Sequence, residues 1–96
     1  MDLDEIKEVL REHKPLLEHK YHVSTLGIFG SYVRNEQADD SDLDILVDFA
    51  APIGLFEFID LEEYLSELLC MRVDLVSRTA LKPYIGKRIL SEVQLV

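Results

Sequence analysis

The chain has 96 residues, of which 48% are hydrophobic, and it carries a formal net charge of −9 at neutral pH. This length predicts a single domain over residues 1–96 with one core, and the aliphatic residues along it exclude a disordered chain. No apolar run could span a bilayer and the N-terminus is unlike a signal peptide, so we expect a cytoplasmic protein with no membrane partner.

Charge is unevenly distributed along the chain. Eleven acidic residues lie from Glu36 to Glu67 with no Lys or Arg among them, whereas five of the ten basic residues lie at or beyond Arg72. These C-terminal basic residues can hold a triphosphate or an acidic partner, or they can form an ordinary solvated helix face. Because phosphate contacts need basic residues, the acidic balance makes free DNA or RNA an unsuitable main ligand.

The N-terminal segment begins with a capping pair, Asp2 and Glu5, which predicts a helix start. Apolar residues then recur at helical spacing. Pro15 lacks an N–H and clashes with the preceding turn, so we expect a break near residues 13–14 and a second short helix from Pro15. The three histidines match no compact metal motif and are expected to be solvated; they are His13, His19 and His22.

The middle of the chain predicts two strands, Val23–Phe29 and Leu43–Phe49, separated by a helical turn over residues 31–35 and a polar loop. Residues 55–69 have the pattern of an amphipathic helix. Its expected apolar face comprises Leu55, Phe58, Ile59, Leu61, Leu65, Leu68 and Leu69. Cys70 ends this pattern, which favours a buried structural thiol over a reactive one.

The C-terminal part predicts a third strand over residues 71–76, a helix over 79–90 and a short closing strand over 92–96. The order of elements therefore predicts an α/β (α+β) fold with a small mixed β-sheet flanked by helices.

Asp42 and Asp44 alternate with Leu43, Ile45 and Val47 in the second predicted strand. Side chains two residues apart on a strand share a face, so burial of the aliphatic residues places both carboxylates on the opposite face. Two close carboxylates repel each other unless a cation neutralises them. Mg²⁺ commonly binds through carboxylates together with substrate phosphates, so we expect a divalent-metal site here.

Asp74 is the third candidate acid, in an apolar strand where a carboxylate is unusual unless it has a function or faces solvent. If its strand lies beside the second strand, Asp74 joins Asp42 and Asp44 as a metal ligand and can accept the proton of a nucleophile. In a two-metal arrangement one ion activates the attacking oxygen and the other stabilises charge on the phosphate. The alternative is an edge-strand carboxylate that faces water.

Gly30 and Ser31 lie where the first strand meets the helical turn. Glycine allows the backbone to approach a phosphate closely, free N–H groups attract anions, and the Ser31 hydroxyl adds a donor. Arg34, one turn later, can reach a β- or γ-phosphate in a forked contact. The alternative for Arg34 is a solvated side chain paired with Glu36 or Asp39.

These residues resemble a known family. Gly30-Ser31, followed after ten residues by Asp42-Leu43-Asp44, is similar to the signature of the polymerase-β-type nucleotidyltransferase superfamily. The short length and the segment from Lys82 to Leu90 resemble its minimal nucleotidyltransferases (MNT), which are encoded beside HEPN-domain proteins in prokaryotes. The resemblance implies the fold of that superfamily, a Mg²⁺-binding catalytic triad of Asp42, Asp44 and Asp74, and triphosphate contacts from Gly30, Ser31 and Arg34.

The same resemblance implies a biological role. MNT proteins of this kind pair with a HEPN toxin, usually a ribonuclease, and neutralise it by transferring AMP from ATP to a toxin tyrosine. One departure from the family is Asn35, at a position that is often glycine. Asparagine tolerates left-handed conformations, so we expect this change to alter the loop more than the chemistry.

Our main hypothesis is Mg²⁺-dependent transfer of AMP from ATP to a hydroxyl of a HEPN-domain partner protein, without direct contact to nucleic acid. One alternative is a binding module that neutralises its partner by occlusion. A further alternative is a transferase that acts on a small molecule such as an antibiotic. Two hydrophobic pairs can belong either to the core or to an interface in a homodimer or hetero-oligomer. They are Leu55-Phe56 and Leu95-Val96.

Overall fold

One four-stranded mixed sheet forms the centre of the molecule, as the computed structural model shows for residues 1–96. Its order is β3–β2–β1–β4. The central strands β1 (Val23–Phe29) and β2 (Leu43–Phe49) are antiparallel, and β3 (Val73–Ser77) lies parallel to β2. The short β4 (Gln94–Leu95) adds to β1 on the other edge. The predicted mixed sheet is therefore confirmed.

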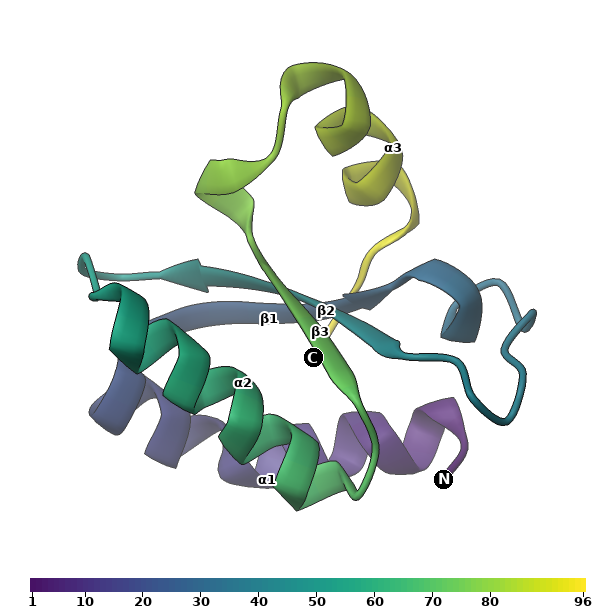
Figure 1. Ribbon diagram of the computed structural model, residues 1–96, viewed down its shortest axis with the longest axis horizontal. Coiled ribbons are helices and arrows are strands. Elements are labelled where there is room, and N and C mark those ends of the chain that lie inside the picture. The colour runs from purple at the N-terminus through teal and green to yellow at the C-terminus, as the bar shows by residue number, and fades with distance from the viewer.

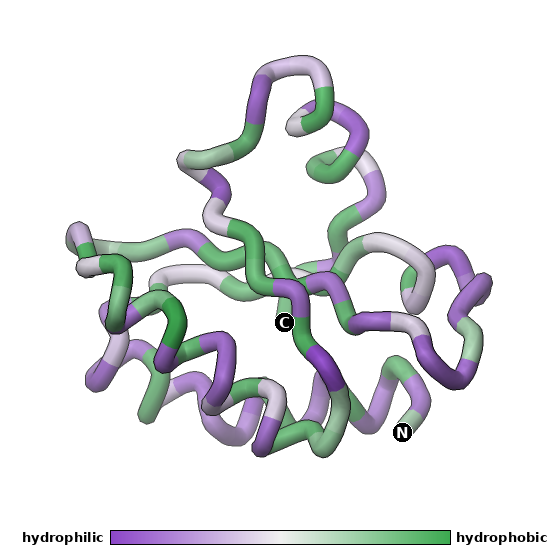
Figure 2. The backbone as a smooth tube through the Cα atoms, in the orientation of Figure 1, coloured by the Kyte–Doolittle hydropathy of each residue, from purple (hydrophilic) through white to green (hydrophobic).

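Helices α1 (Leu3–Tyr21) and α2 (Leu55–Leu69) lie together against one face of the sheet, and α3 (Pro83–Glu92) projects from the other side (Figure 1). Strand alternation explains the layering, since one side chain in two points between the sheet and the paired helices. The fully buried residues there include Ile6, Leu10, Leu17, Ile28, Leu43, Ile45, Val47, Leu61 and Leu65. Figure 2 shows this contrast, with hydrophobic central strands and a mostly hydrophilic loop before β2.

Helix α1 runs without interruption through Pro15, so the predicted break and second helix are wrong. Pro15 removes the N–H that would bond to the carbonyl of Arg11, but both residues are exposed and water can satisfy that carbonyl. Leu10 and Leu17 are fully buried on either side of the proline. Their packing holds the helix together where its backbone bonding is weakened.

Helix α2 has the predicted limits but a narrower buried face than predicted. Leu61, Leu65 and Leu69 are buried, whereas Leu55 and Ile59 are exposed. The predicted burial of Cys70 is also wrong. Cys70 follows the last buried position and takes a left-handed conformation with φ 54° that ends the helix, so its side chain points outward.

The C-terminal elements have the expected order, but their limits differ from those predicted. The predicted helix over 79–90 is split into the 3-10 turn η2 (Arg78–Ala80) and α3, because Pro83 keeps Lys82 extended and so starts the helix itself. The closing strand is confirmed as β4. It packs closely on β1, since a Cβ at Gly27 would overlap the side chain of Val93. No helix of the structure is long and apolar enough to cross a membrane.

The uninterrupted α1 predicts that Pro15→Ala stabilises the protein, because alanine restores the missing backbone bond on a solvated helix face. We expect the free energy of unfolding to rise by about 1–2 kcal/mol. Alanine stabilises the helix, but part of this gain is offset because the unfolded chain has more conformational entropy without the proline. Urea unfolding followed by circular dichroism measures it. Glu18→Ala, at another exposed position of α1, is the matched control and should change the stability little. An unchanged or lower stability for Pro15→Ala would contradict this account.

Candidate active site

The register of the sheet brings two of the predicted acids together. Asp44 on β2 pairs with Asp74 on the parallel strand β3, and on its other side Asp44 pairs with Phe29 of β1. Leu43 and Ile45 point into the core, so the carboxylates of Asp44 and Asp74 share the opposite face of the sheet, as predicted. Gly30, directly after Phe29, lies beside Asp44. Residues from three strands therefore meet at one place.

Asp44 is the most perturbed acid of the chain. Burial, then the negative charge of Asp74 and a hydrogen bond with it, and lastly the charge of Asp42 raise the pKa of Asp44 from 3.8 to about 6. The positive charge of Arg34 opposes this rise without overcoming it. Like charges held in a partly desolvated site favour a shared proton, or a cation in its place.

Asp42 lies at the edge of this group. Its side chain is 42% exposed, and Arg72 Nε lies 3.4 Å from its Oδ1. Arg72 itself is highly exposed, and ion pairs of this kind hold a side chain only weakly. No three His, Cys, Asp or Glu side chains lie in an arrangement that could hold a metal ion. The three-carboxylate site therefore stays a prediction, with Asp44 and Asp74 as its close pair.

The chemistry of the close pair nevertheless fits a divalent cation. Asp44 and Asp74 present carboxylate oxygens side by side, and the charge of Arg34 only partly offsets the effects that raise the pKa of Asp44. Hard cations such as Mg²⁺ prefer this donor type.

Gly30 is required by its neighbour Asp44. It has a left-handed φ of 81°, and a Cβ at this position would overlap the Asp44 carboxylate, with Cγ only 3.0 Å away. A side chain here would be strained and would displace the acid. Gly30 begins the 3-10 turn η1 (Gly30–Tyr32), and Ser31 is partly exposed next to it. Asn35, with φ 58°, has the left-handed conformation expected of it.

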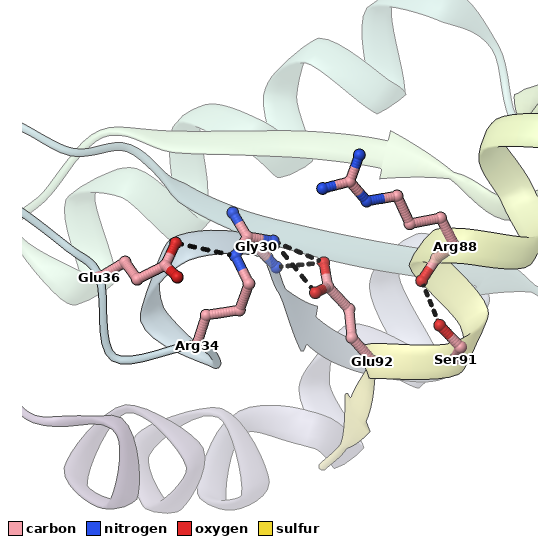
Figure 3. A network of polar contacts seen from close by, with 6 residues as sticks. All are labelled: Gly30, Arg34, Glu36, Arg88, Ser91 and Glu92. Atoms are coloured by element: carbon pink, nitrogen blue, oxygen red, sulfur yellow. Dashed lines mark hydrogen bonds and ion pairs between the residues drawn. The ribbon is translucent and has the colours of Figure 1, made fainter.

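Arg34 lies between two carboxylates (Figure 3). Its Nε donates to Glu36 Oε2 at 3.2 Å, which is the pairing given above as the alternative to a phosphate contact. Its Nη1 donates to both carboxylate oxygens of Glu92 at 3.0 Å. The hydrogen bonds to Glu92, and to a smaller extent the one to Glu36, hold the pKa of Arg34 above its usual range.

Glu92 is the residue that sequence reasoning missed. It is the last residue of α3, and it also accepts a hydrogen bond from the backbone N–H of Gly30 at 3.1 Å. Its sequence neighbours gave no signal, because Glu at a helix end near a predicted strand is ordinary. The antiparallel addition of β4 to β1 brings it to the site.

The stability of the metal-free protein should depend on pH through Asp44. Because folding raises this pKa to about 6, the folded state binds the proton more tightly than the unfolded state. Protonated Asp44 therefore makes its full contribution to the free energy of unfolding below about pH 4, and this contribution is lost as pH rises through about 6. Asp44→Asn should not show this loss. At pH 7 without metal its free energy of unfolding should exceed that of the parent protein by on the order of 1 kcal/mol, allowing for solvent screening.

Thermal unfolding in EDTA between pH 4 and pH 8 measures the difference. Asp40→Asn, in the exposed loop before β2, is the matched control and should follow the parent protein. Parallel pH profiles for the parent and Asp44→Asn would show that the two carboxylates do not interact as described.

Comparison with known proteins places this geometry in a family. The family model of the nucleotidyltransferase domain matches residues 3–96. "Protein adenylyltransferase MntA" of Thermococcus cleftensis is 50% identical over 93 residues, which are 97% of this chain and 94% of that protein. "Putative protein adenylyltransferase MJ0126" of Methanocaldococcus jannaschii is 52% identical over 88 residues, 91% of this chain and 90% of that protein.

Solved structures agree with the family match. "Structure of putative minimal nucleotidyltransferase" is 35% identical, with a TM-score of 0.81 over 98% of this chain and 95% of that one. A toxin–antitoxin structure with AMP-PNP (23% identical, TM-score 0.72, 99% and 72% covered) has the same fold. So does the MNT antitoxin in complex with a tri-AMPylated HEPN toxin of Shewanella oneidensis (22% identical, TM-score 0.62, 96% and 66% covered). This chain therefore belongs to the nucleotidyltransferase domain family, as one of its minimal nucleotidyltransferases.

Proposed function

We propose that this protein transfers AMP from ATP to a tyrosine hydroxyl of a HEPN-domain partner and thereby acts as its antitoxin. The observation that carries the proposal is the register of Asp44 with Asp74 directly beside Gly30. This juxtaposition supplies carboxylates for a metal next to donors for a phosphate. The names of the relatives, protein adenylyltransferases, support a protein acceptor.

The nucleotide would be oriented by the residues around Gly30. The backbone there can approach the triphosphate closely, Ser31 adds a hydroxyl donor, and Arg34 supplies a guanidinium for a β- or γ-phosphate. Asp44, Asp74 and Asp42 would hold Mg²⁺, which when bound neutralises phosphate charge and lowers the pKa of an attacking hydroxyl.

In the proposed reaction the tyrosine oxygen forms a bond to the α-phosphorus in line with the leaving group. The bond from the α-phosphorus to the bridging oxygen of the β-phosphate breaks, and pyrophosphate leaves. The tyrosine proton passes to a carboxylate, for which the exposed Asp74 is the candidate. We propose that the acceptor hydroxyl belongs to another molecule. The acidic surface of the chain, with net charge −9, suits a protein acceptor better than a nucleic acid.

Asp44→Asn tests this proposal. We expect AMP transfer to fall by at least about 100-fold, because loss of one central metal-binding carboxylate costs several kcal/mol of transition-state stabilisation. Labelled ATP, Mg²⁺ and a HEPN-domain protein as acceptor give the readout, and mass spectrometry locates AMP on a tyrosine. Asp40→Asn should transfer normally. Absence of labelling by the parent protein, or labelling that survives Asp44→Asn, would refute the proposal.

A second candidate function, neutralisation by occlusion, is favoured by exposed apolar residues away from the carboxylates. Phe56 is 85% exposed at the start of α2. Beside it lies a hollow of about 550 Å³ that Ile53, Leu55 and Phe58 help to line. Such a surface can bind a partner without any chemistry.

Cells that express the partner toxin distinguish the two functions. If transfer is the mechanism, replacing Asp42, Asp44 and Asp74 together by alanine abolishes protection, whereas Phe56→Ala weakens it only as far as it weakens complex formation. Co-purification with the partner controls for binding by the triple variant. Protection that persists in the triple variant would favour occlusion and count against the enzymatic role.

A further inference from the structure

The carboxylate of Glu92 occupies a distinctive position at the start of η1. One oxygen accepts from the backbone N–H of Gly30 at 3.1 Å, and both accept from Nη1 of Arg34 at 3.0 Å (Figure 3). The side chain is only 20% exposed. A single anionic group thus engages both a backbone donor and a guanidinium, and these are two of the groups assigned above to the triphosphate.

The chemistry of this contact is that of a bound phosphate oxygen. A carboxylate and a phosphate are both anionic acceptors, and both bind a backbone N–H together with an arginine through charge-assisted hydrogen bonds. Arg34 cannot direct the same Nη1 hydrogens at Glu92 and at a phosphate, and the Gly30 N–H is a single donor. Glu92 and a nucleotide phosphate therefore exclude each other at these donors.

We propose that Glu92 is an internal competitor of the nucleotide: it holds Gly30 and Arg34 in the nucleotide-free protein and must release them when the triphosphate binds. This inference rests on the proposed function, because it assumes that the triphosphate uses these donors. It assigns to α3 a part in setting nucleotide affinity, which the carboxylates of the sheet alone do not determine.

The surroundings of Glu92 allow such a release. Gly86 is the only buried residue of α3, so displacing the end of this helix uncovers little apolar surface. The segment after it is anchored, since Gln94 and Leu95 pair with β1 and the N–H of Val96 donates to the carbonyl of Leu26 at 2.9 Å. The Glu92 carboxylate is thus returned to the same place whenever the site is free.

Glu92→Gln tests the competition, because it removes the negative charge and keeps the shape. Isothermal titration calorimetry with ATP and Mg²⁺, without acceptor, should show about tenfold tighter binding than the parent protein, since charge-assisted hydrogen bonds no longer oppose the ligand. Glu36→Gln is the matched control. Glu36 also pairs with Arg34, at 3.2 Å, but it does not contact Gly30, so its change should be about twofold or less.

Arg34→Gln identifies the route of the effect. If Glu92 competes through Arg34, the gain from Glu92→Gln should be much smaller in an Arg34→Gln background, as a double-mutant cycle measures. A merely structural Glu92, which orders the loop for the nucleotide, predicts the opposite sign: Glu92→Gln would bind ATP more weakly. Thermal unfolding confirms that each variant is folded. If Glu92→Gln is not folded, Glu92→Asp replaces it, because the aspartate side chain is too short to make both contacts.

The outcomes separate this inference from the proposed function. Tighter binding by Glu92→Gln but not by Glu36→Gln supports the competition. Unchanged or weaker binding by Glu92→Gln, or an equal gain in Glu36→Gln, overturns the competition and leaves the proposed function in place. If neither the parent protein nor any variant binds ATP, the proposed function fails and this inference fails with it.

Discussion

The rest of the site depends on the contact between Asp44 and Asp74. Parallel pairing of β2 with β3 sets the two carboxylates directly opposite each other, on the face of the sheet that the core does not occupy. This arrangement costs free energy in the metal-free protein, because burial and the facing charge raise the pKa of Asp44 to about 6. In the proposed function, a cation that binds together with an anionic substrate would relieve this cost.

The neighbouring backbone is fitted to this pair. Gly30 leaves no space between the strand end and the Asp44 carboxylate, so a larger residue could be accommodated only by moving the acid. Close approach of backbone to carboxylate also brings the donors proposed for phosphate next to the oxygens proposed for a metal ion. Glycine at position 30 is thus explained by packing and conformation together, and its proposed contact with phosphate follows from the same geometry.

The sequence predicted most of this arrangement because its signals are local. Alternation in Leu43–Phe49 determines which way Asp44 points, and the helical pattern of 55–69 fits its observed limits. Failures came where tertiary packing overrode local preference. Burial of Leu10 and Leu17 keeps α1 continuous through Pro15. At the end of α2, Leu69 is buried and the next residue, Cys70, is exposed.

The contact of Glu92 with Gly30 and Arg34 could not be predicted in this way, since Glu92 lies 62 positions after Gly30 and 58 positions after Arg34 in the sequence. It depends on β4 crossing to the free edge of β1, and a two-residue strand carries almost no sequence signal. Its consequence is that Glu92 already engages the donors of Gly30 and Arg34 in this structure. In the proposed function a cation would relieve the repulsion between Asp44 and Asp74, and a phosphate would replace Glu92 at Arg34. A bound cation attracts the phosphate, so binding of metal and binding of nucleotide should each favour the other.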